Sequence, residues 1–378
     1  MATPSHAGLT ERQALMILSA LPDFGPITVR RLQAAIDQPV ERIFELGKED
    51  LGSLLSSKRA AALLEWEQHF DLVREEERLV ELDARFVIPG DADYPPLLGK
   101  LIDAPLGLYQ RGPRKVKGPA IAIVGTRYAS QYGLKVTRQL TTELVSAGFT
   151  IVSGLALGID TEAHRTALEM NGSTVAVLGN GVDRLYPPQN RALFGEMLQR
   201  GALFSEFYLG RKADRQTFPQ RNRIVSGMTD ATLVVESASR GGSLITARFA
   251  MEQNRTVFAV PGRLDQPGSR GCLELIRDGA TLVTSAEDIL EELRFMQLDL
   301  PLQTPGPEKT ATKSSGFSAP ASIDEQHVAA ALEGERLHPD QICDRSELAS
   351  HQVHAALMML ELQRRVARNA DGTYELLG

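Results

Sequence analysis

Hydrophobic residues recur every three or four positions through residues 1–85, which is the spacing of helices that bury one face. The pattern predicts a small helical domain at the start of the chain. The expected helices are Glu11–Leu21, Ile27–Ile36, Val40–Leu46, Glu49–Leu55 and Lys58–Arg78.

The first two helices are joined by Pro22-Asp-Phe-Gly-Pro26, which predicts a tight turn in which Gly25 can adopt a positive φ. Two helices around a glycine turn resemble SAM-like and helix-hairpin-helix modules, which contact DNA phosphates through backbone N–H groups. A plain packing domain gives the same pattern, so both interpretations stay open.

Short apolar runs alternate with helical patterns over residues 86–298. The expected strands are Ala120–Val124, Phe149–Val152, Ser173–Leu178, Ala202–Ser205, Ala231–Val235, Thr256–Val260 and, at a sheet edge, Thr281–Val283. Helices are expected at Gln131–Ala147 and Asp160–Met170. The alternation predicts an α/β fold with right-handed crossovers and a mostly parallel sheet. Ligands of such sheets bind beyond the carboxyl ends of the strands.

Residues 299–320 are rich in Pro, Ser, Thr and Gly, and we expect a flexible linker there. Residues 321–378 then show three helical patterns and two short strands around an Asp-Gly turn, which is typical of a winged helix. The expected helices are Glu325–Leu332, Pro339–Arg345 and Ser350–Gln363. This module carries many acidic residues, so a protein contact is at least as plausible for it as a DNA contact.

Composition narrows the class of protein. Of 378 residues, 43% are hydrophobic and 24% charged, as in soluble globular proteins. A net charge of −7 argues against a protein that coats nucleic acid indiscriminately, although it allows a local basic groove. The two cysteines, Cys272 and Cys343, lie far apart, and no segment has the character of a signal peptide or a membrane span. We expect a reduced, cytoplasmic protein without a metal or cofactor.

Candidate anion-binding groups fall at the ends of expected strands. Gly125-Thr126-Arg127 follows the first strand, and Gly241-Gly242-Ser243 opens a helix whose free N–H groups favour anions. Arg221-Asn222-Arg223 stands just before a helix-like run, and arginine side chains offer planar forks of donors. The pattern predicts a site for a sugar–phosphate chain or a nucleotide.

Two further loops contain candidate residues, each with a structural alternative. Ser153 and Gly154 begin a glycine-rich loop, and Asp160 is expected to cap the helix that follows it. A structural hydrogen bond that fixes the loop is favoured over a catalytic Asp160–His164 pair. Tyr186, Asn190 and Arg191 combine an aromatic ring with a cation, which suits base stacking and phosphate pairing. A packed Tyr186 and a capping Asn190 are equally compatible with the sequence.

Taken in order, these motifs resemble the DprA family of bacterial DNA-processing proteins, also called Smf. The matching segments are Val124-Gly-Thr-Arg127, Ser153-Gly-Leu-Ala-Leu-Gly-Ile-Asp160, Gly181-Val-Asp-Arg-Leu-Tyr-Pro-Pro-Gln-Asn190, Phe218-Pro-Gln-Arg-Asn-Arg223, Gly242-Ser-Leu-Ile-Thr-Ala247 and Val257-Phe-Ala-Val-Pro-Gly262. The resemblance implies an extended Rossmann-like core between an N-terminal SAM-like domain and a C-terminal winged-helix-like domain.

The resemblance also implies a function. Members of the family bind and protect single-stranded DNA, displace single-strand binding protein and help load the RecA recombinase, without catalysis and as dimers through the core. Residue motifs and resemblance together predict the following DNA contacts: Gly125, Thr126, Arg127, Ser153, Gly154, Tyr186, Asn190, Arg191, Arg221, Asn222, Arg223, Gly241, Gly242 and Ser243. The chain departs from the family pattern at Thr126, where serine is usual, and at Leu157, where arginine is frequent.

An enzyme is the alternative, because nucleotide phosphoribohydrolases resemble this fold. Those enzymes place a catalytic glutamate in the helix after a Pro-Gly-Gly loop. Here the loop reads Arg240-Gly-Gly-Ser-Leu-Ile-Thr-Ala-Arg-Phe249, with no acidic residue before Glu252. Glycoside cleavage needs a carboxylate beside the scissile bond, so the sequence favours the non-catalytic DNA-binding interpretation.

Overall fold

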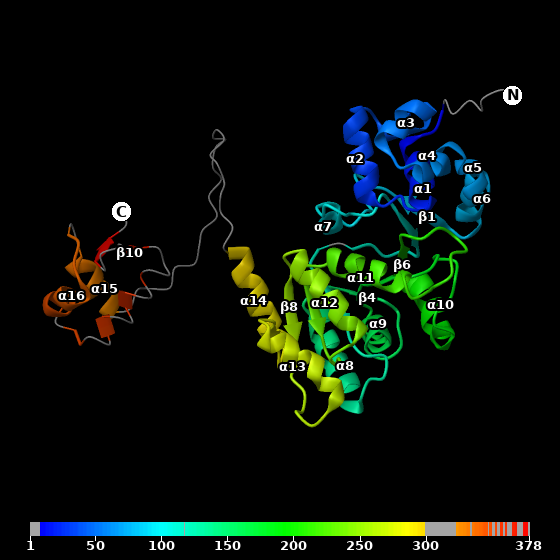
Figure 1. Cartoon of the computed structure of the whole chain (residues 1–378). Coiled ribbons are helices and arrows are strands. Elements are labelled where there is room, and N and C mark those ends of the chain that lie inside the picture. The colour runs from blue at the N-terminus through cyan, green and yellow to red at the C-terminus, as the bar shows by residue number, and fades with distance from the viewer. Residues whose placement is uncertain are drawn as a thin grey trace. The chain divides into compact units, whose positions relative to one another are not determined.

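The computed structural model describes residues 8–116, 118–298 and, with short gaps, 323–376 (Figure 1). The chain divides into two compact units, Met1–Pro301 and Leu302–Gly378. The predicted linker at 299–320 and much of the predicted helix at 350–363 lie outside the described residues.

The helical region begins as the apolar spacing predicts and differs in its second half. Its elements are α1 Glu11–Ala20, α2 Pro26–Ile36, the 3₁₀ helix η1 Val40–Glu45, α3 Lys48–Leu54, α4 Ser57–Leu64, α5 Trp66–His69 and α6 Leu72–Glu81. The single helix expected over Lys58–Arg78 is wrong, because Phe70 has extended backbone and Asp71 caps a new helix by accepting from the Arg74 N–H. In the α1–α2 turn Asp23, not Gly25, has the positive φ of 65°.

A nine-stranded sheet forms the centre of the first unit. Its strands are β1 Ala84–Val87, β2 Leu108–Arg111, β3 Ala120–Val124, β4 Thr150–Ser153, β5 Thr174–Val177, β6 Ala202–Ser205, β7 Ala231–Val234, β8 Thr256–Ala259 and β9 Thr281–Leu282. Their order is β1-β2-β6-β5-β4-β3-β7-β8-β9. The seven neighbouring strands β6-β5-β4-β3-β7-β8-β9 pair in parallel, which confirms the mostly parallel sheet. The antiparallel strands β1 and β2 were not predicted.

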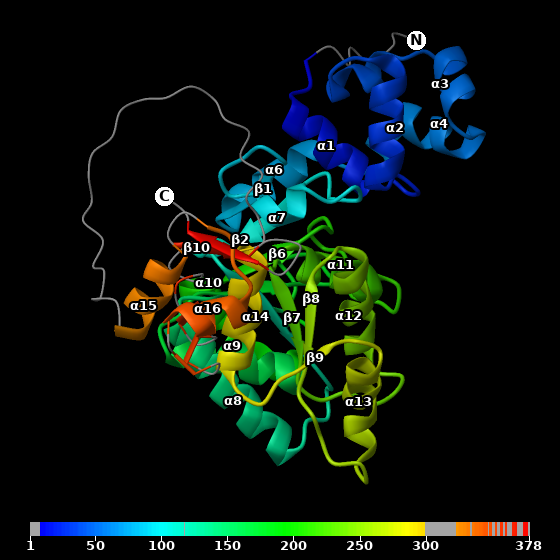
Figure 2. The ribbon, with the colours of Figure 1, turned by 90° about the vertical axis from the view of Figure 1, so that its left-hand side faces the viewer.

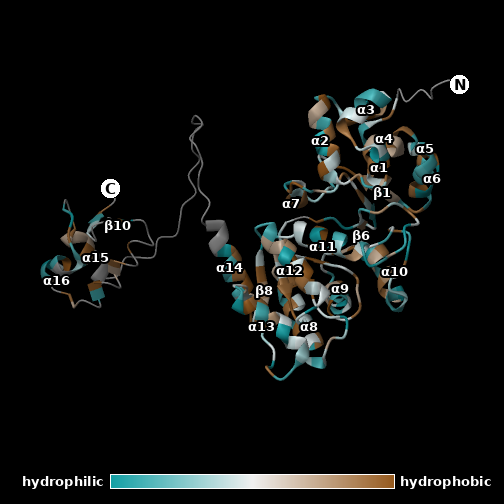
Figure 3. Ribbon diagram, in the orientation of Figure 1, coloured by the Kyte–Doolittle hydropathy of each residue, from teal (hydrophilic) through white to brown (hydrophobic). Residues whose placement is uncertain are grey.

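Side chains of β3 alternate between two cores, as they must in a strand buried on both faces. Ala120, Ala122 and Val124 pack with residues of α11 Thr217–Gly227, α12 Gly242–Glu252 and α13 Arg270–Arg277. Ile121 and Ile123 pack with α8 Gln131–Ser146, α9 Ile159–Glu169 and α14 Ala286–Leu298. Figure 2 shows these helices on opposite sides of the sheet, and Figure 3 shows hydrophobic colours on the central strands.

The order of the strands reverses at β3. From β3 the chain adds β4, β5 and β6 on one side, with α8, α9 and α10 Arg191–Arg200 as connections, and then returns to place β7 on the other side. The loops at the carboxyl ends of β3 and β7 therefore lead to helices on opposite faces of the sheet and leave a crevice between them. This crevice is the topological switch point, where doubly wound α/β sheets bind ligands.

The second unit is a small helical and β module. It contains α15 Ile323–Ala331, α16 Pro339–Ser346 and the antiparallel strands β10 Val366–Arg368 and β11 Tyr374–Leu376. Val328, Leu332, Ile342 and Val366 share its core. The two strands agree with the hairpin expected from the sequence. Among the helices described in either unit, none is both long enough and apolar enough to pass through a bilayer.

Candidate functional site

Three loops are joined by backbone hydrogen bonds at the switch point. The N–H of Thr126, after β3, donates to the carbonyl oxygen of Glu236, after β7, at 2.7 Å. The N–H of Ile159, at the start of α9, donates to the carbonyl oxygen of Thr126 at 3.3 Å. Gly158 has φ +80°, and a Cβ there would collide with the Thr126 carbonyl, so only glycine fits this crossing.

The loops enclose a hollow of about 350 Å³, with a smaller hollow beside it. We call the two together the switch-point pocket. Both hollows are lined by Arg127, Gly154, Ala156, Phe218 and Arg221. The larger adds the residues Val124, Gly125, Thr126, Tyr128, Asp160, Asn222, Val225, Ala238, Gly241, Gly242, Ser243 and Thr246, and the smaller adds Leu155, Leu157, Leu178, Gly179, Asn180, Tyr186 and Pro187.

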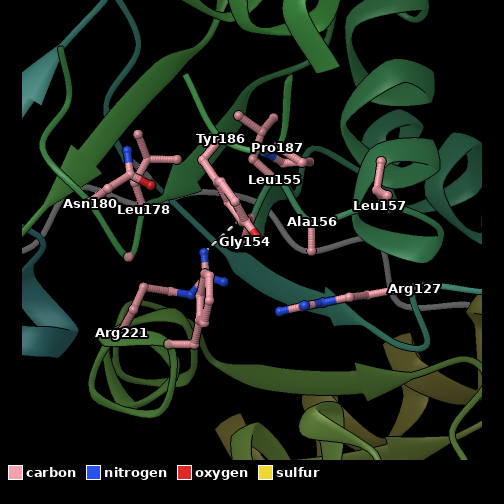
Figure 4. Close-up of a pocket in the computed structure, with 12 residues that line it drawn as sticks. Arg127, Gly154, Leu155, Ala156, Leu157, Leu178, Asn180, Tyr186, Pro187 and Arg221 are labelled. Atoms are coloured by element: carbon pink, nitrogen blue, oxygen red, sulfur yellow. Dashed lines mark hydrogen bonds between the residues drawn. The ribbon is translucent and has the colours of Figure 1, made fainter. Parts of the chain in front are cut away.

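Arg221 forms an inner wall of the pocket and is 5% exposed. Its Nη1 donates to the carbonyl oxygens of Gly154, at 2.6 Å, and of Val177 (Figure 4). A Cβ on Gly154 would lie 2.6 Å from the Arg221 Cζ, so the absence of a side chain lets the guanidinium approach. Burial, with a smaller contribution from Arg127, lowers the pKa of Arg221 to about 10, while Asp160 opposes the shift. Arg221 therefore remains a cation at neutral pH.

Arg127 forms the outer, exposed wall, and its side chain extends toward Arg221 in Figure 4. Its guanidinium carbon lies 5.1 Å from the centre of the Phe218 ring, a cation–π contact. The Phe218 ring in turn lies 5.6 Å from the ring of Tyr186, which is 41% exposed. Neither Arg127 nor Arg221 forms an ion pair with a carboxylate that the structure describes. The pocket therefore combines two cations, neither in a direct ion pair with a described carboxylate, and a pair of aromatic rings. Asp160 acts on Arg221 by charge alone.

The loop between β4 and α9 is held from below. The buried carboxylate of Asp160 accepts from the N–H groups of Gly154, at 3.1 Å, and Ala156, at 3.4 Å. This confirms a structural hydrogen bond that fixes the loop. The expected cap is wrong, because Gly158 is the N-cap of α9 and Asp160 lies inside the helix. Burial raises the pKa of Asp160, while these donors and the charge of Arg221 oppose the increase. Between the donors, Leu155 adopts φ +55°, a conformation that a branched side chain rarely takes and that these bonds maintain.

The loop between β7 and α12 brings a helix N-terminus to the pocket. Gly241 caps α12 with extended backbone, and Gly242 and Ser243 form its first turn, where N–H groups face outward from the helix end. The Ser243 hydroxyl donates to Ser237 at 2.8 Å and is buried, so its backbone, not its side chain, faces the pocket. Asn222 Nδ2 approaches the Gly242 carbonyl oxygen at 3.4 Å and links α11 to α12.

Four of the predicted contact residues take other places. Ser153 is buried and its hydroxyl donates to the Ile123 carbonyl oxygen at 2.6 Å. Asn190 is also buried and donates to the Leu155 carbonyl oxygen and the Thr161 hydroxyl, both at 2.9 Å, so it supports the loop from inside. Arg191, the first residue of α10, is exposed but does not line the pocket.

Arg223 is the fourth predicted contact residue that lies outside the pocket. The Arg-Asn-Arg segment lies inside α11 rather than before it, and helix residues two apart do not share a face. Arg223 therefore points away from the pocket, where its Nη2 contacts both Glu206 carboxylate oxygens at 2.6 and 2.7 Å and its Nη1 donates to the Asp103 carbonyl oxygen at 2.8 Å. Burial raises the pKa of Glu206, and Arg223 opposes the increase.

Arg223→Ala is expected to lower the free energy of unfolding by about 2–3 kcal/mol. The two side chains of the Arg223–Glu206 pair are only 12% and 15% exposed, so removal of the cation leaves a poorly hydrated carboxylate. Urea unfolding measures the loss, with Arg191→Ala as the exposed control. Equal stability of the two variants would contradict this structural role for Arg223.

His164 is completely buried and does not pair with Asp160, so the less favoured catalytic pair is absent from the described structure. Its Nδ1 lies 2.7 Å from the Thr174 hydroxyl, which donates to the Ile151 carbonyl oxygen. The hydroxyl must therefore accept from Nδ1–H, which leaves Nε2 unprotonated. Burial, with a smaller contribution from Arg221, lowers the pKa of His164 to about 3.

The unfolded chain takes up a proton on His164 near pH 6.5, whereas the folded chain does so only near pH 3. Stability is therefore lost as the pH falls between these values, by about 1.4 kcal/mol per unit. His164→Asn, which can keep the bond to Thr174, should remove this slope in urea titrations. The exposed His69 offers the matched control His69→Asn, which should retain the wild-type slope.

Two lining residues outside the predicted contacts shape the pocket. Phe218 stands next to Pro219 in the first turn of α11, where proline is tolerated. The sequence signal that could have identified Phe218 is an aromatic residue at the start of a helix. Leu157 lines the smaller hollow and adds apolar surface to this side of the pocket.

Comparison with known proteins identifies the family. Residues 85–294 match the family described as DNA recombination-mediator protein A, and residues 312–372 match the DprA winged helix domain. The chain is 37% identical to Protein Smf of Synechocystis over 321 residues, which cover 77% of this chain and 80% of that protein. It is 43% identical to DNA processing protein DprA of Bacillus subtilis over 202 residues, 53% of this chain and 68% of the relative.

Solved structures of DNA processing protein A lead to the same family. The X-ray structure of DprA from Streptococcus pneumoniae superposes with a TM-score of 0.65 at 34% identity, covering 75% of this chain and 98% of that one. A Helicobacter pylori structure, whose title reports the single-stranded DNA binding mode of DNA processing protein A, superposes with a TM-score of 0.51 at 28% identity, covering 57% and 97%. The family matches, the sequence identities and the superposed structures agree: the chain belongs to the DprA family of DNA-processing proteins, also called Smf.

Proposed function

We propose that the chain binds single-stranded DNA in the switch-point pocket. The observation that carries the proposal is the presence in one pocket of two arginines, Arg127 and Arg221, against a single carboxylate, Asp160, among the described lining residues. Phosphate oxygens would be held by these guanidinium groups and by the N-terminus of α12. A base would stack on the Tyr186–Phe218 pair beside them.

The pocket favours a single strand over a duplex. A hollow of about 350 Å³ accommodates one nucleotide but not a base pair, and the aromatic rings need an unstacked base. Fluorescence anisotropy with a labelled oligonucleotide and its matched duplex tests this over a salt series. The expected result is preference for the single strand, with a logarithmic salt slope of about −0.7 for each neutralised phosphate. Equal affinity for both forms, or binding that does not respond to salt, would contradict the proposal.

The wider role follows from the family. We propose that the protein protects incoming single-stranded DNA during transformation, displaces single-strand binding protein and helps load RecA, and that it acts as a homodimer through the core. Support comes from the family description as a recombination mediator. RecA filament formation on DNA covered by single-strand binding protein should accelerate when the protein is added. Light scattering gives the molar mass in solution, and a monomer at micromolar concentration would contradict the proposed homodimer.

We propose a non-catalytic role for the same pocket. A nucleotide hydrolase must place a carboxylate at the glycosidic bond, and Asp160 is the one carboxylic acid among the described lining residues. Asp160 is buried and accepts two backbone N–H groups, which commits it to the loop. Release of free base from nucleoside monophosphates would favour the phosphoribohydrolase alternative, and its loss in Asp160→Asn would place the activity here.

A further inference from the structure

A second cavity, of about 450 Å³, lies beyond the carboxyl ends of β7 and β8. Its lining consists of Ser130, Tyr132, Val235, Glu236, Val260, Pro261, Gly262, Arg263, Gln266 and Ser269. It borders the switch-point pocket, because the carbonyl of Glu236 accepts from Thr126 while its carboxylate accepts from the N–H and the hydroxyl of Ser130, at 2.9 and 3.1 Å. The same residue thus connects both hollows.

The chemistry of this cavity suits a nucleobase better than a phosphate. Val235, Val260 and Pro261 supply apolar surface, and the carboxylate of Glu236 in the wall repels an anion. Tyr132 is 54% exposed, and its hydroxyl donates to the Pro261 carbonyl oxygen at 3.1 Å, which fixes the ring at the cavity. A fixed, half-exposed aromatic ring over an apolar hollow is a stacking platform.

Exposed aromatic and cationic groups continue from one hollow to the next. Tyr128, 92% exposed, lines the switch-point pocket, and Tyr132 follows four residues later, within about 14 Å along the chain. Lys135 lies one turn further along α8, on the face that carries Tyr132. Lys135 and Arg270 are exposed and have no ion pair with a described carboxylate, so they are free to meet phosphates outside the cavity.

We propose that this cavity is a second base subsite, which takes a later nucleotide of the strand whose phosphates occupy the switch-point pocket. The proposal rests on the proposed function and extends it from one nucleotide to a short track. Tyr128 would support the strand between the two hollows. The base would stack on Tyr132, and Lys135 would neutralise the phosphate beside it.

Anisotropy with oligothymidylates of increasing length tests the track, using wild type, Tyr132→Ala, Tyr132→Phe and the surface control Leu264→Ala. For strands long enough to reach both hollows, Tyr132→Ala should bind about 5- to 100-fold more weakly than wild type, whereas the shortest strands should bind both equally. Tyr132→Phe, which keeps the ring but loses its hydrogen bond to Pro261, should weaken binding less than Tyr132→Ala does. Leu264→Ala, on the exposed loop after Arg263, should bind as wild type does.

A stacked base is detected independently by placing 2-aminopurine at successive positions of a long strand. Quenching should occur at one position in addition to that held by the Tyr186–Phe218 pair, and Tyr132→Ala should abolish it there alone. If Tyr132→Ala binds long strands as tightly as wild type does, the second subsite is wrong while the first pocket stands. If wild type binds no strand of any length, the proposed function fails and the subsite fails with it.

Discussion

Arg127→Ala is expected to weaken binding of single-stranded DNA by about 10- to 100-fold, the range for loss of a charge-assisted hydrogen bond. The free energy of unfolding should stay the same, since the Arg127 side chain is exposed and its described contact is the ring of Phe218. The substitution should therefore weaken DNA binding without changing the stability of the fold.

Anisotropy over a salt series measures the change, because loss of one neutralised phosphate should make the logarithmic salt slope shallower by about 0.7. Arg191→Ala is the matched control: it removes another exposed arginine that the sequence predicts to contact DNA but that does not line the pocket. If Arg191→Ala weakens binding as much as Arg127→Ala does, the strand does not run through the switch-point pocket.

The sequence predicted the parallel part of the sheet because its strands are buried on both faces and therefore read as continuous apolar runs. It did not predict β1 and β2, which contain Arg85 and Arg111 and have no such run. The position of β2 is set by antiparallel pairing with β6, a partner about a hundred residues away, and β1 pairs with β2. Local spacing carries no signal for a contact of that kind.

The loops of the site were also predictable, since strand ends in a doubly wound sheet must meet at the switch point. The direction of each side chain was not. The sequence pattern put the start of α11 after Arg223, so both motif arginines were expected to reach one ligand. The helix begins at Thr217, and its geometry directs the two arginines to different sides. Asn190 and Ser153 show the same limit: a polar residue in a ligand loop can equally hold the loop from inside.

Arg221 both contacts the ligand site and supports the loops, since it faces the pocket and fixes the carbonyl groups of two loops. Arg221→Ala is therefore expected to lower the free energy of unfolding by about 3–5 kcal/mol and to abolish measurable DNA binding. The buried carbonyl oxygens of Gly154 and Val177 lose their donor, and Asp160 loses the cation that opposes its raised pKa. Urea unfolding and anisotropy measure the two losses.

The charge on Asp160 provides the test that separates the two effects. Without Arg221 the pKa of Asp160 should rise further above its unfolded value, so the folded state takes up a proton before the unfolded state does and the stability deficit should shrink as the pH falls. The double variant Arg221→Ala with Asp160→Asn should recover part of the stability at neutral pH, because it carries no unpaired buried charge, yet it should still not bind DNA. Recovery of binding in the double variant would show that Arg221 acts on the loops alone and that phosphates contact other residues.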